Sequence, residues 1–263
     1  MYRWGDPRDS DFGDVHFYDY QHDCVDISHF PAARFISEYG YQSFPSFQSW
    51  KAISSESDWS PYSQLTNFRQ RHPSGTEELF LQIAKHFDIS QASFNGSDFS
   101  KFLYLSQVIQ SWCYASAFSF WRQNMGIERG KTMGILYWQL NDVWQAPTWS
   151  SIEYGGKWKL LHYQVKKSFA SVSISAHERE PGRLSVFLTS DSSGSVSANC
   201  SITCMDWKVS EILCFLSRSG HCIEKNSNQK TAAFFYIIQD CRSLNRFDWK
   251  EQELVCDHED CTK

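Results

Sequence analysis

Three short apolar runs constrain the fold of this chain more than any other feature of its sequence. They cover residues 14–20, 34–38 and 132–140, and the first two end in polar or aromatic residues. Their residues do not alternate cleanly between polar and apolar types. That pattern is typical of strands that are buried on both faces of a parallel sheet.

Helical patterns occupy the sequence between and after these runs. The clearest pattern lies within residues 101–124, where apolar residues recur three and four positions apart along one helical face. Two further helices are expected over 77–87 and 158–169. Strands that alternate with helices in this way indicate parallel βα units and an α/β fold.

The pattern changes near Phe169. Residues 171–176 and 183–188 alternate polar and apolar side chains, and Pro181-Gly182 between them is a turn signal. Such sequence is typical of an antiparallel sandwich. The expected organisation is an α/β domain over 1–169, the beginning of a β-sandwich domain over 170–205, and a divergent, cysteine-rich tail over 206–263.

The charge and hydropathy of the chain exclude some classes of partner. Its 263 residues carry a net charge of −5, and the pI is about 6.0. No basic face is indicated, so neither nucleic acid nor an anionic membrane is an expected partner. No apolar stretch approaches the ~20 residues that a membrane-spanning helix needs.

Residues that can carry chemistry follow each of the three predicted strands. Glu38 ends the second one, and taken alone it would commonly be an ordinary surface residue. The carboxyl ends of parallel barrel strands, however, meet at one mouth, where barrels of this type perform their chemistry. Aromatic side chains, which make up 16% of the chain, stack on sugar rings as well as building cores. The side chains expected beside Glu38 are His16, Tyr18, Trp138, Asn141 and Asp142, a mixture of groups that suits a sugar.

Three blocks of sequence resemble the lysosomal β-mannosidases of animals, which belong to the same group of retaining glycosidases as β-galactosidases and β-glucuronidases. The blocks are Gly13–His16, Arg34–Ser43 and Gly134–Pro147, and the resemblance extends over roughly residues 1–190. It implies that Glu38 is the catalytic nucleophile and that Trp138 lines the sugar subsite. It also implies that the three strands are the sixth, seventh and eighth of a TIM (β/α)8 barrel, with a β-sandwich domain after it.

The resemblance also implies a substrate and a location. The expected substrate is an oligosaccharide of a glycoprotein that carries a terminal, non-reducing β-D-mannose. The expected compartment is the lysosome, and neither a cofactor nor a metal ion is expected.

The chain departs from the family in its second carboxyl group. A retaining glycosidase needs two carboxyl groups about 5–5.5 Å apart. In the family, the proton donor is the Glu of an Asn-Glu pair at the end of the fourth strand, and the chain contains no Asn-Glu dipeptide. Sequence for the first five strands is missing as well. The alternative is therefore a truncated, catalytically inactive isoform that at most binds sugar.

The cysteines of the tail allow three interpretations, which are a zinc site, disulfide bonds, and a divergent or alternatively spliced end. Seven of the nine cysteines lie between Cys200 and Cys261. Their spacing matches no paired zinc-ligand set, and disulfides would leave one cysteine over. We favour a divergent or alternatively spliced end.

Sequons at Asn95 and Asn199 make N-glycans possible, and because no signal peptide precedes them, we expect Met1 not to be the natural N-terminus.

Overall fold

The computed structural model separates into two compact units, Met1–Phe169 and Ala170–Lys263. The residues that the structure describes are 9–89, 94, 96–125, 130–180, 183–191, 198–205, 212–216, 222–224, 235–243 and 254–257.

A three-stranded parallel sheet forms the centre of the first unit. Its strands are β1 (Val15–Phe17), β2 (Phe35–Tyr39) and β3 (Gly134–Tyr137), in the order β1-β2-β3. Both pairings are parallel. The sequence therefore predicted correctly three strands and an α/β fold with a parallel sheet.

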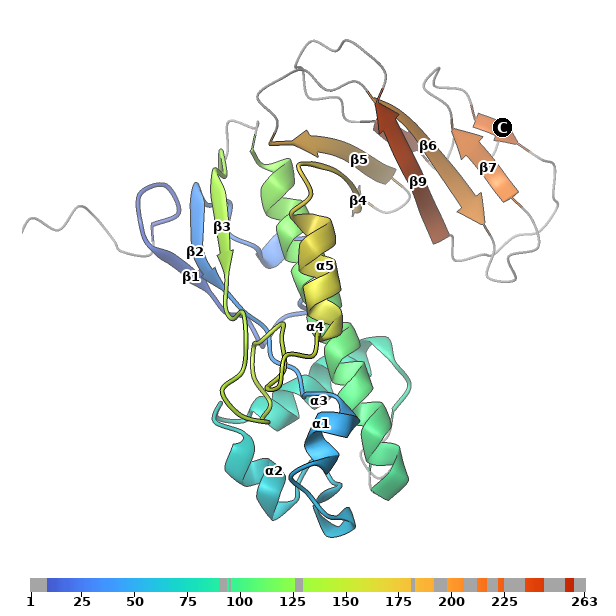
Figure 1. Ribbon diagram of the computed structural model, residues 1–263. Helices are drawn as coiled ribbons and strands as arrows, with labels where there is room; N and C mark the ends of the chain where they lie inside the picture. Colours follow the sequence, from blue (N-terminus) through green and yellow to red (C-terminus); the bar gives the residue numbers. More distant parts are fainter. Residues whose placement is uncertain are drawn as a thin grey trace, which may run out of the picture. The chain divides into compact units, whose positions relative to one another are not determined.

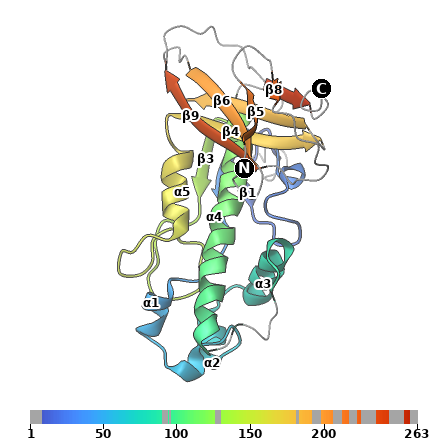
Figure 2. The ribbon, with the colours of Figure 1, turned by 90° about the vertical axis from the view of Figure 1, so that its right-hand side faces the viewer.

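Two helices lie along one face of this sheet. They are α4 (Phe99–Gln123) and α5 (Leu160–Ser168), which run side by side in front of the strands in Figure 2. The helices expected over 101–124 and 158–169 are confirmed within two residues at each end. Trp121 of α4 is fully buried against Phe17 and Tyr39, so aromatic packing fixes the helix on the sheet.

The long segment between β2 and α4 forms a helical region at the carboxyl ends of the strands (Figure 1). Its helix α3 (Gly75–His86) matches the helix expected over 77–87. The shorter helices were not predicted, because their few residues show no helical period. They are α1 (Phe47–Lys51), α2 (Gln64–Arg69) and the 3-10 helices Glu56–Asp58 and Gly96–Asp98; a further 3-10 helix, Ile27–His29, follows β1.

The second unit consists of antiparallel strands. β4 (Val172–Glu180) pairs with β5 (Arg183–Ser190), which confirms the two strands expected here, and β10 (Leu254–Asp257) adds to β5. The turn expected at Pro181-Gly182 lies outside the described residues. A second sheet has the order β8-β7-β6-β9. Its strands are β6 (Ala198–Met205), β7 (Ile212–Leu216), β8 (Cys222–Glu224) and β9 (Phe235–Ser243).

Most of these later strands lie where the strand pattern of the sequence fades. Cysteine, serine and charged residues interrupt the alternation there, so pattern alone did not predict them. The side chains of the tail cysteines and of Asn199 lie outside the described residues, as does Asn95. Within the described ranges, no helix is both long and apolar enough to cross a membrane.

Candidate active site

The register of the parallel sheet brings the three predicted strand ends together. His16 of β1 is paired with Glu38 of β2, and Tyr39 is paired with Tyr137 of β3. The residue after Tyr137 is Trp138, whose backbone N–H donates to the carbonyl of Tyr39 at 2.8 Å. Side chains from all three strand ends therefore share one edge of the sheet.

Glu38 lies at the centre of this edge. The hydroxyl of Tyr18 donates to its Oε1 at 2.5 Å, and Nδ1 of His16 lies 3.9 Å from the same oxygen. His16 also approaches Asp14, with Nε2 and Oδ2 3.3 Å apart. The Glu38 side chain is 30% exposed, so its carboxylate is both oriented by a donor and reachable from solvent.

Tyr18 remains a proton donor over a wide pH range. Burial raises the pKa of its hydroxyl well above the usual 10.0, and the hydrogen bond to Glu38 and the nearby charge of that carboxylate raise it further. A phenol that stays protonated keeps its hydrogen bond to a carboxylate. Tyr18 therefore holds one oxygen of Glu38 in a fixed direction.

Trp138 begins the segment that follows β3, and its side chain is 46% exposed. Both backbone groups of Trp138 are hydrogen-bonded: its N–H donates to Tyr39, and its carbonyl accepts from the Tyr114 hydroxyl at 2.6 Å. The peptide bond to Gln139 is cis. An indole with a fixed backbone and an exposed ring can form an apolar floor for a sugar.

Gly40 lies where the segments that follow the three strands pack closely together. A Cβ atom built there would lie 2.6 Å from Cε1 of Tyr18 and 2.8 Å from both the Trp138 carbonyl oxygen and Cδ1 of Trp149. Only a glycine leaves room for this contact. Trp149, whose Nε1 donates to the Tyr20 hydroxyl at 2.5 Å, was not predicted, because it lies in a loop without periodicity.

Asn141 and Asp142 occupy different environments although they are neighbours. Asn141 is exposed. Asp142 is only 5% exposed, and its carboxylate accepts from the hydroxyls of Thr148 and Ser150. The buried Lys159 ammonium lies 3.9 Å away, and burial lowers the pKa of that lysine to about 8 although Asp142 opposes the shift. The carboxylate of Asp142 is thus occupied by internal partners.

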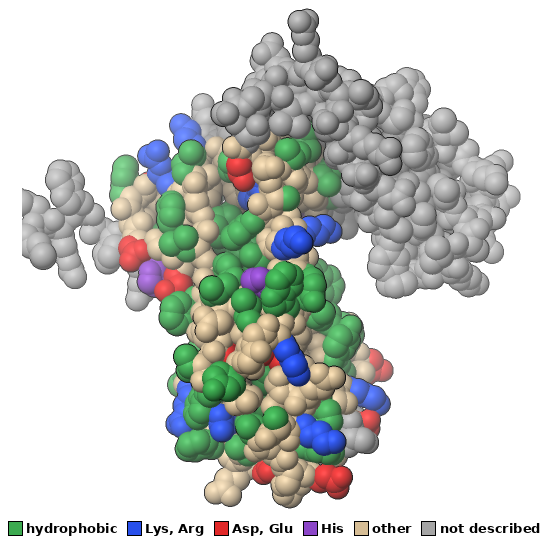
Figure 3. Space-filling model, in the orientation of Figure 1, with side chains coloured by type: hydrophobic (Ala, Val, Ile, Leu, Met, Phe, Trp, Pro, Cys, Tyr) green, Lys and Arg blue, Asp and Glu red, His purple; other side chains and the backbone are tan. Residues whose placement is uncertain are grey.

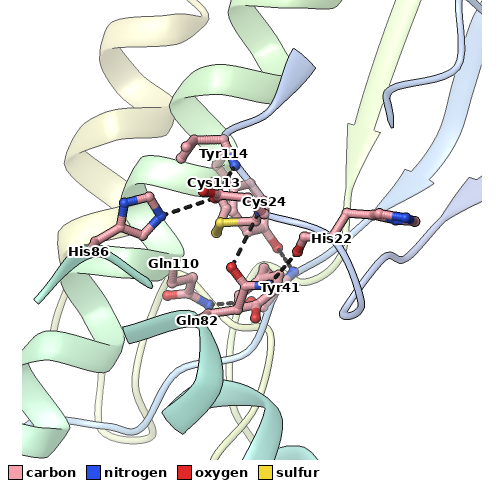
Figure 4. The surroundings of a disulfide bond; sticks show 10 residues. His22, Cys24, Tyr41, Gln82, His86, Gln110, Cys113 and Tyr114 are labelled. Atoms are coloured by element: carbon pink, nitrogen blue, oxygen red, sulfur yellow. Dashed lines mark hydrogen bonds and ion pairs between the residues drawn. A yellow bond between two sulfur atoms is a disulfide. The ribbon is translucent and has the colours of Figure 1, made fainter. Parts of the chain in front are cut away.

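A disulfide between Cys24 and Cys113 fixes the loop after β1 to helix α4 (Figure 4). Next to it, the Cys24 N–H donates to Oε1 of Gln82 at 3.3 Å, and Nε2 of His86 lies 3.0 Å from Oδ1 of Asp23. No sequence pattern predicted this pair, because 89 positions separate the two cysteines. Among the described residues, no cluster of three or more His, Cys, Asp or Glu side chains could hold a metal ion.

Comparison with known proteins finds relatives for much of the chain. No family model matches it. The β-mannosidase of Capra hircus is 49% identical over 167 residues, which cover 62% of this chain and 19% of that protein. The β-mannosidase of Rattus norvegicus is 41% identical over 219 residues, which cover 82% of this chain and 25% of that protein.

Two solved structures share the fold. The crystal structure of a β-D-mannosidase from Dictyoglomus thermophilum matches with a TM-score of 0.66 and 26% identity, over 98% of this chain and 30% of that one. The exo-chitosanase of Amycolatopsis orientalis matches with a TM-score of 0.54 and 15% identity, over 94% of this chain and 29% of that one. The second likeness concerns the fold alone.

The chain spans between about a fifth and a quarter of the length of the curated relatives that it matches. Within that span the identity is high and the structural match covers nearly the whole chain. The chain is therefore a homologue of the β-mannosidases, which are glycoside hydrolases, and corresponds to one part of their length.

Proposed function

We propose that this chain forms the nucleophile-bearing part of a retaining β-mannosidase. The observation that carries the proposal is the position of Glu38 at the carboxyl end of β2, hydrogen-bonded by Tyr18 at 2.5 Å and adjoining the segment that begins with Trp138. The substrate would be an oligosaccharide of a glycoprotein with a terminal, non-reducing β-D-mannose.

In this mechanism Glu38 attacks the anomeric carbon of the mannose. The glycosidic bond breaks as the Glu38–carbon bond forms, and the leaving oxygen takes a proton from a second carboxylic acid. Water then attacks the same carbon as the Glu38–carbon bond breaks, which releases mannose with retained configuration and restores the Glu38 carboxylate, while the second acid, now a carboxylate, takes a proton from the water. The chain has no Asn-Glu dipeptide, so the donor would come from a part of the longer family fold that this chain does not contain.

Tyr18 would orient the nucleophile, and Trp138 would lie under the sugar ring. His16 and Asn141 would bind hydroxyl groups of the mannose, since both present polar atoms near the strand ends. Asp142 would act indirectly, because its buried carboxylate already binds Thr148 and Ser150 and so holds the loop after β3.

We further propose that the three parallel strands are the last three of a (β/α)8 barrel over residues 1–169. Helices cover one face of the sheet, as the outer helices of such a barrel would. The large apolar side chains of Phe35 and Leu136 are 43% and 56% exposed. Figure 3 shows hydrophobic side chains at the surface over this sheet, and further barrel strands would bury such residues.

Residues 170–205 would begin a β-sandwich domain, and 206–263 a divergent tail. The antiparallel pairing of β4 with β5 supports the sandwich. The compartment we propose is the lysosome, with N-glycans possible at Asn95 and Asn199. The Cys24–Cys113 disulfide supports passage through an oxidising compartment, because such bonds form there and are rare in the cytosol.

A mechanism-based fluorosugar tests the proposal. A 2-deoxy-2-fluoro-β-mannosyl fluoride should inactivate the full-length protein and leave a covalent label on Glu38, found by peptide mass spectrometry. The Glu38→Gln protein should take no label, and the galactose-configured reagent should inactivate far more slowly. A label on any other residue would refute the assignment of Glu38.

A further inference from the structure

One turn of helix α4 is attached to all three strand ends of the site. Gln110, Cys113 and Tyr114 stand at positions i, i+3 and i+4, so they share one face of the helix. Figure 4 shows Cys113 bonded to Cys24, and Gln110 beside Tyr41. Cys113 contacts the segment after β1, Gln110 contacts the segment after β2, and Tyr114 contacts the segments after β2 and β3.

The three attachments differ in kind. Cys113 is bonded covalently to Cys24, in the loop that follows β1 and Tyr18. Gln110 donates from Nε2 to the carbonyl of Tyr41, two residues after the end of β2, at 2.8 Å. Tyr114 binds the segment after β2 and the segment after β3 at once.

The Tyr114 hydroxyl connects the other two segments through one oxygen atom. It accepts the backbone N–H of Tyr41 at 3.2 Å and donates to the carbonyl of Trp138 at 2.6 Å. A hydroxyl has one proton to donate and lone pairs to accept with, so both bonds form together. Tyr114 is fully buried, and burial keeps the pKa of its hydroxyl well above 10.0. The bridge thus holds the backbone three residues after Glu38 against the backbone of Trp138.

We propose that Tyr114 is a positioning residue of the active site, which sets the placement of the Trp138 ring relative to the Glu38 carboxylate. Tyr114 acts through the backbone on both sides of the site, because its hydroxyl binds the N–H of Tyr41 and the carbonyl of Trp138. The inference rests on the function proposed above. A shift of about 1 Å between a sugar floor and a nucleophile is enough to slow a glycosidase roughly a hundredfold.

The test compares Tyr114→Phe with the wild-type full-length protein. The substitution keeps the ring and removes the oxygen, so Tyr41 N–H and the Trp138 carbonyl both lose their shared partner. Hydrogen–deuterium exchange should become faster chiefly in peptides 38–43 and 137–141, because the third contact of the hydroxyl, to the Trp149 carbonyl, is longer at 3.5 Å. The rate constant of inactivation by the fluoromannoside should fall roughly ten- to a hundredfold, with a loss of only a few degrees in Tm.

Tyr41→Phe is the matched control. It removes a buried hydroxyl that has no hydrogen-bond partner among the described residues, and it keeps the backbone N–H that Tyr114 binds. This protein should exchange and inactivate as the wild type does. If Tyr114→Phe also behaves like the wild type in either measurement, Tyr114 does not position the site and the inference is wrong.

Two further arms keep the outcomes distinct. If Tyr114→Phe does not fold, Gln110→Met keeps the Tyr114 bridge and removes the bonds of Gln110 to the Tyr41 carbonyl, the Ser43 hydroxyl and the Ser150 carbonyl. Faster exchange over 38–43 with unchanged exchange over 137–141 would then support the attachment by α4, and unchanged exchange at both would overturn it. If the wild type itself takes no label, the proposed function fails, and the exchange pattern alone decides whether Tyr114 couples the two strand ends.

Discussion

The hydroxyl of Tyr18, the residue that follows β1, donates a 2.5 Å hydrogen bond to Oε1 of Glu38. We expect Tyr18→Phe to lower kcat/KM for a nitrophenyl β-mannoside by roughly ten- to a hundredfold, because the nucleophile loses the donor that fixes its direction. The measurement is steady-state kinetics on the full-length protein.

The same substitution at another tyrosine serves as the control for Tyr18→Phe. Tyr104 is a largely exposed residue of α4, and Tyr104→Phe should keep wild-type kcat/KM. An equal loss of activity in both variants would mean that the effect of Tyr18→Phe is not specific to the Glu38 contact.

Gly40→Ala should damage the site more than the fold. The added methyl group would meet the Trp138 carbonyl oxygen and Cδ1 of Trp149, each at 2.8 Å. A backbone oxygen cannot move aside as a flexible side chain can, so the segment after β3 must shift. We expect at least a hundredfold loss of fluoromannoside labelling at Glu38, on the scale of ~1 Å misplacements. Labelling at the wild-type rate would show that the three segments have more freedom than the close contacts imply.

The double substitution Cys24→Ala with Cys113→Ala should lower thermal stability. The bond closes a loop whose ends are 89 positions apart, and removing such a bond typically costs about 2–5 kcal/mol. Differential scanning calorimetry should show a lower Tm in the double variant, and a reducing agent should lower the Tm of the wild type toward the same value. If the reducing agent lowers the Tm of the double variant just as much, other bonds cause the effect.

The local elements of the fold could be predicted from the sequence because each has a local cause. The strands β1, β2 and β3 are short apolar runs, and α4 has apolar residues that recur three and four positions apart, although its buried face also carries Ser106, Gln107 and Gln110. The short helices α1 and α2 lack any period. The later strands β7 to β9 show no regular polar–apolar alternation, and they form by pairing between segments of the second sheet.

Some features of the candidate site could also be predicted from the sequence, and others could not. The sequence predicted which residues end the strands, so His16, Glu38 and Trp138 were expected near each other. It could not show that Asp142 is buried against Ser150 and Lys159, because burial is decided by packing. The roles of Tyr114 and Cys113 depend on contacts 24 to 89 positions apart, for which one sequence carries no signal.

Stability should fall steeply above pH 10 because of the buried tyrosines. Burial is the largest cause that raises the pKa values of Tyr39, Tyr41 and Tyr114 above the usual 10.0. Below pH 10 these groups are protonated in both states, so their contribution to stability is fully present. Above pH 10 the unfolded chain releases protons that the folded chain keeps, so each unit of pH favours unfolding further.

Urea denaturation of the full-length protein between pH 9 and pH 11 measures this effect. The midpoint should fall with pH, and the ultraviolet absorbance of the three tyrosinates should appear only as the protein unfolds. Tyr41→Phe removes one of the three groups, so its midpoint should fall less steeply above the usual tyrosine pKa of 10.0. If all tyrosines of the folded protein titrate near pH 10 while the midpoint stays constant, the phenols are not held in a buried environment and the packing around Tyr114 is wrong.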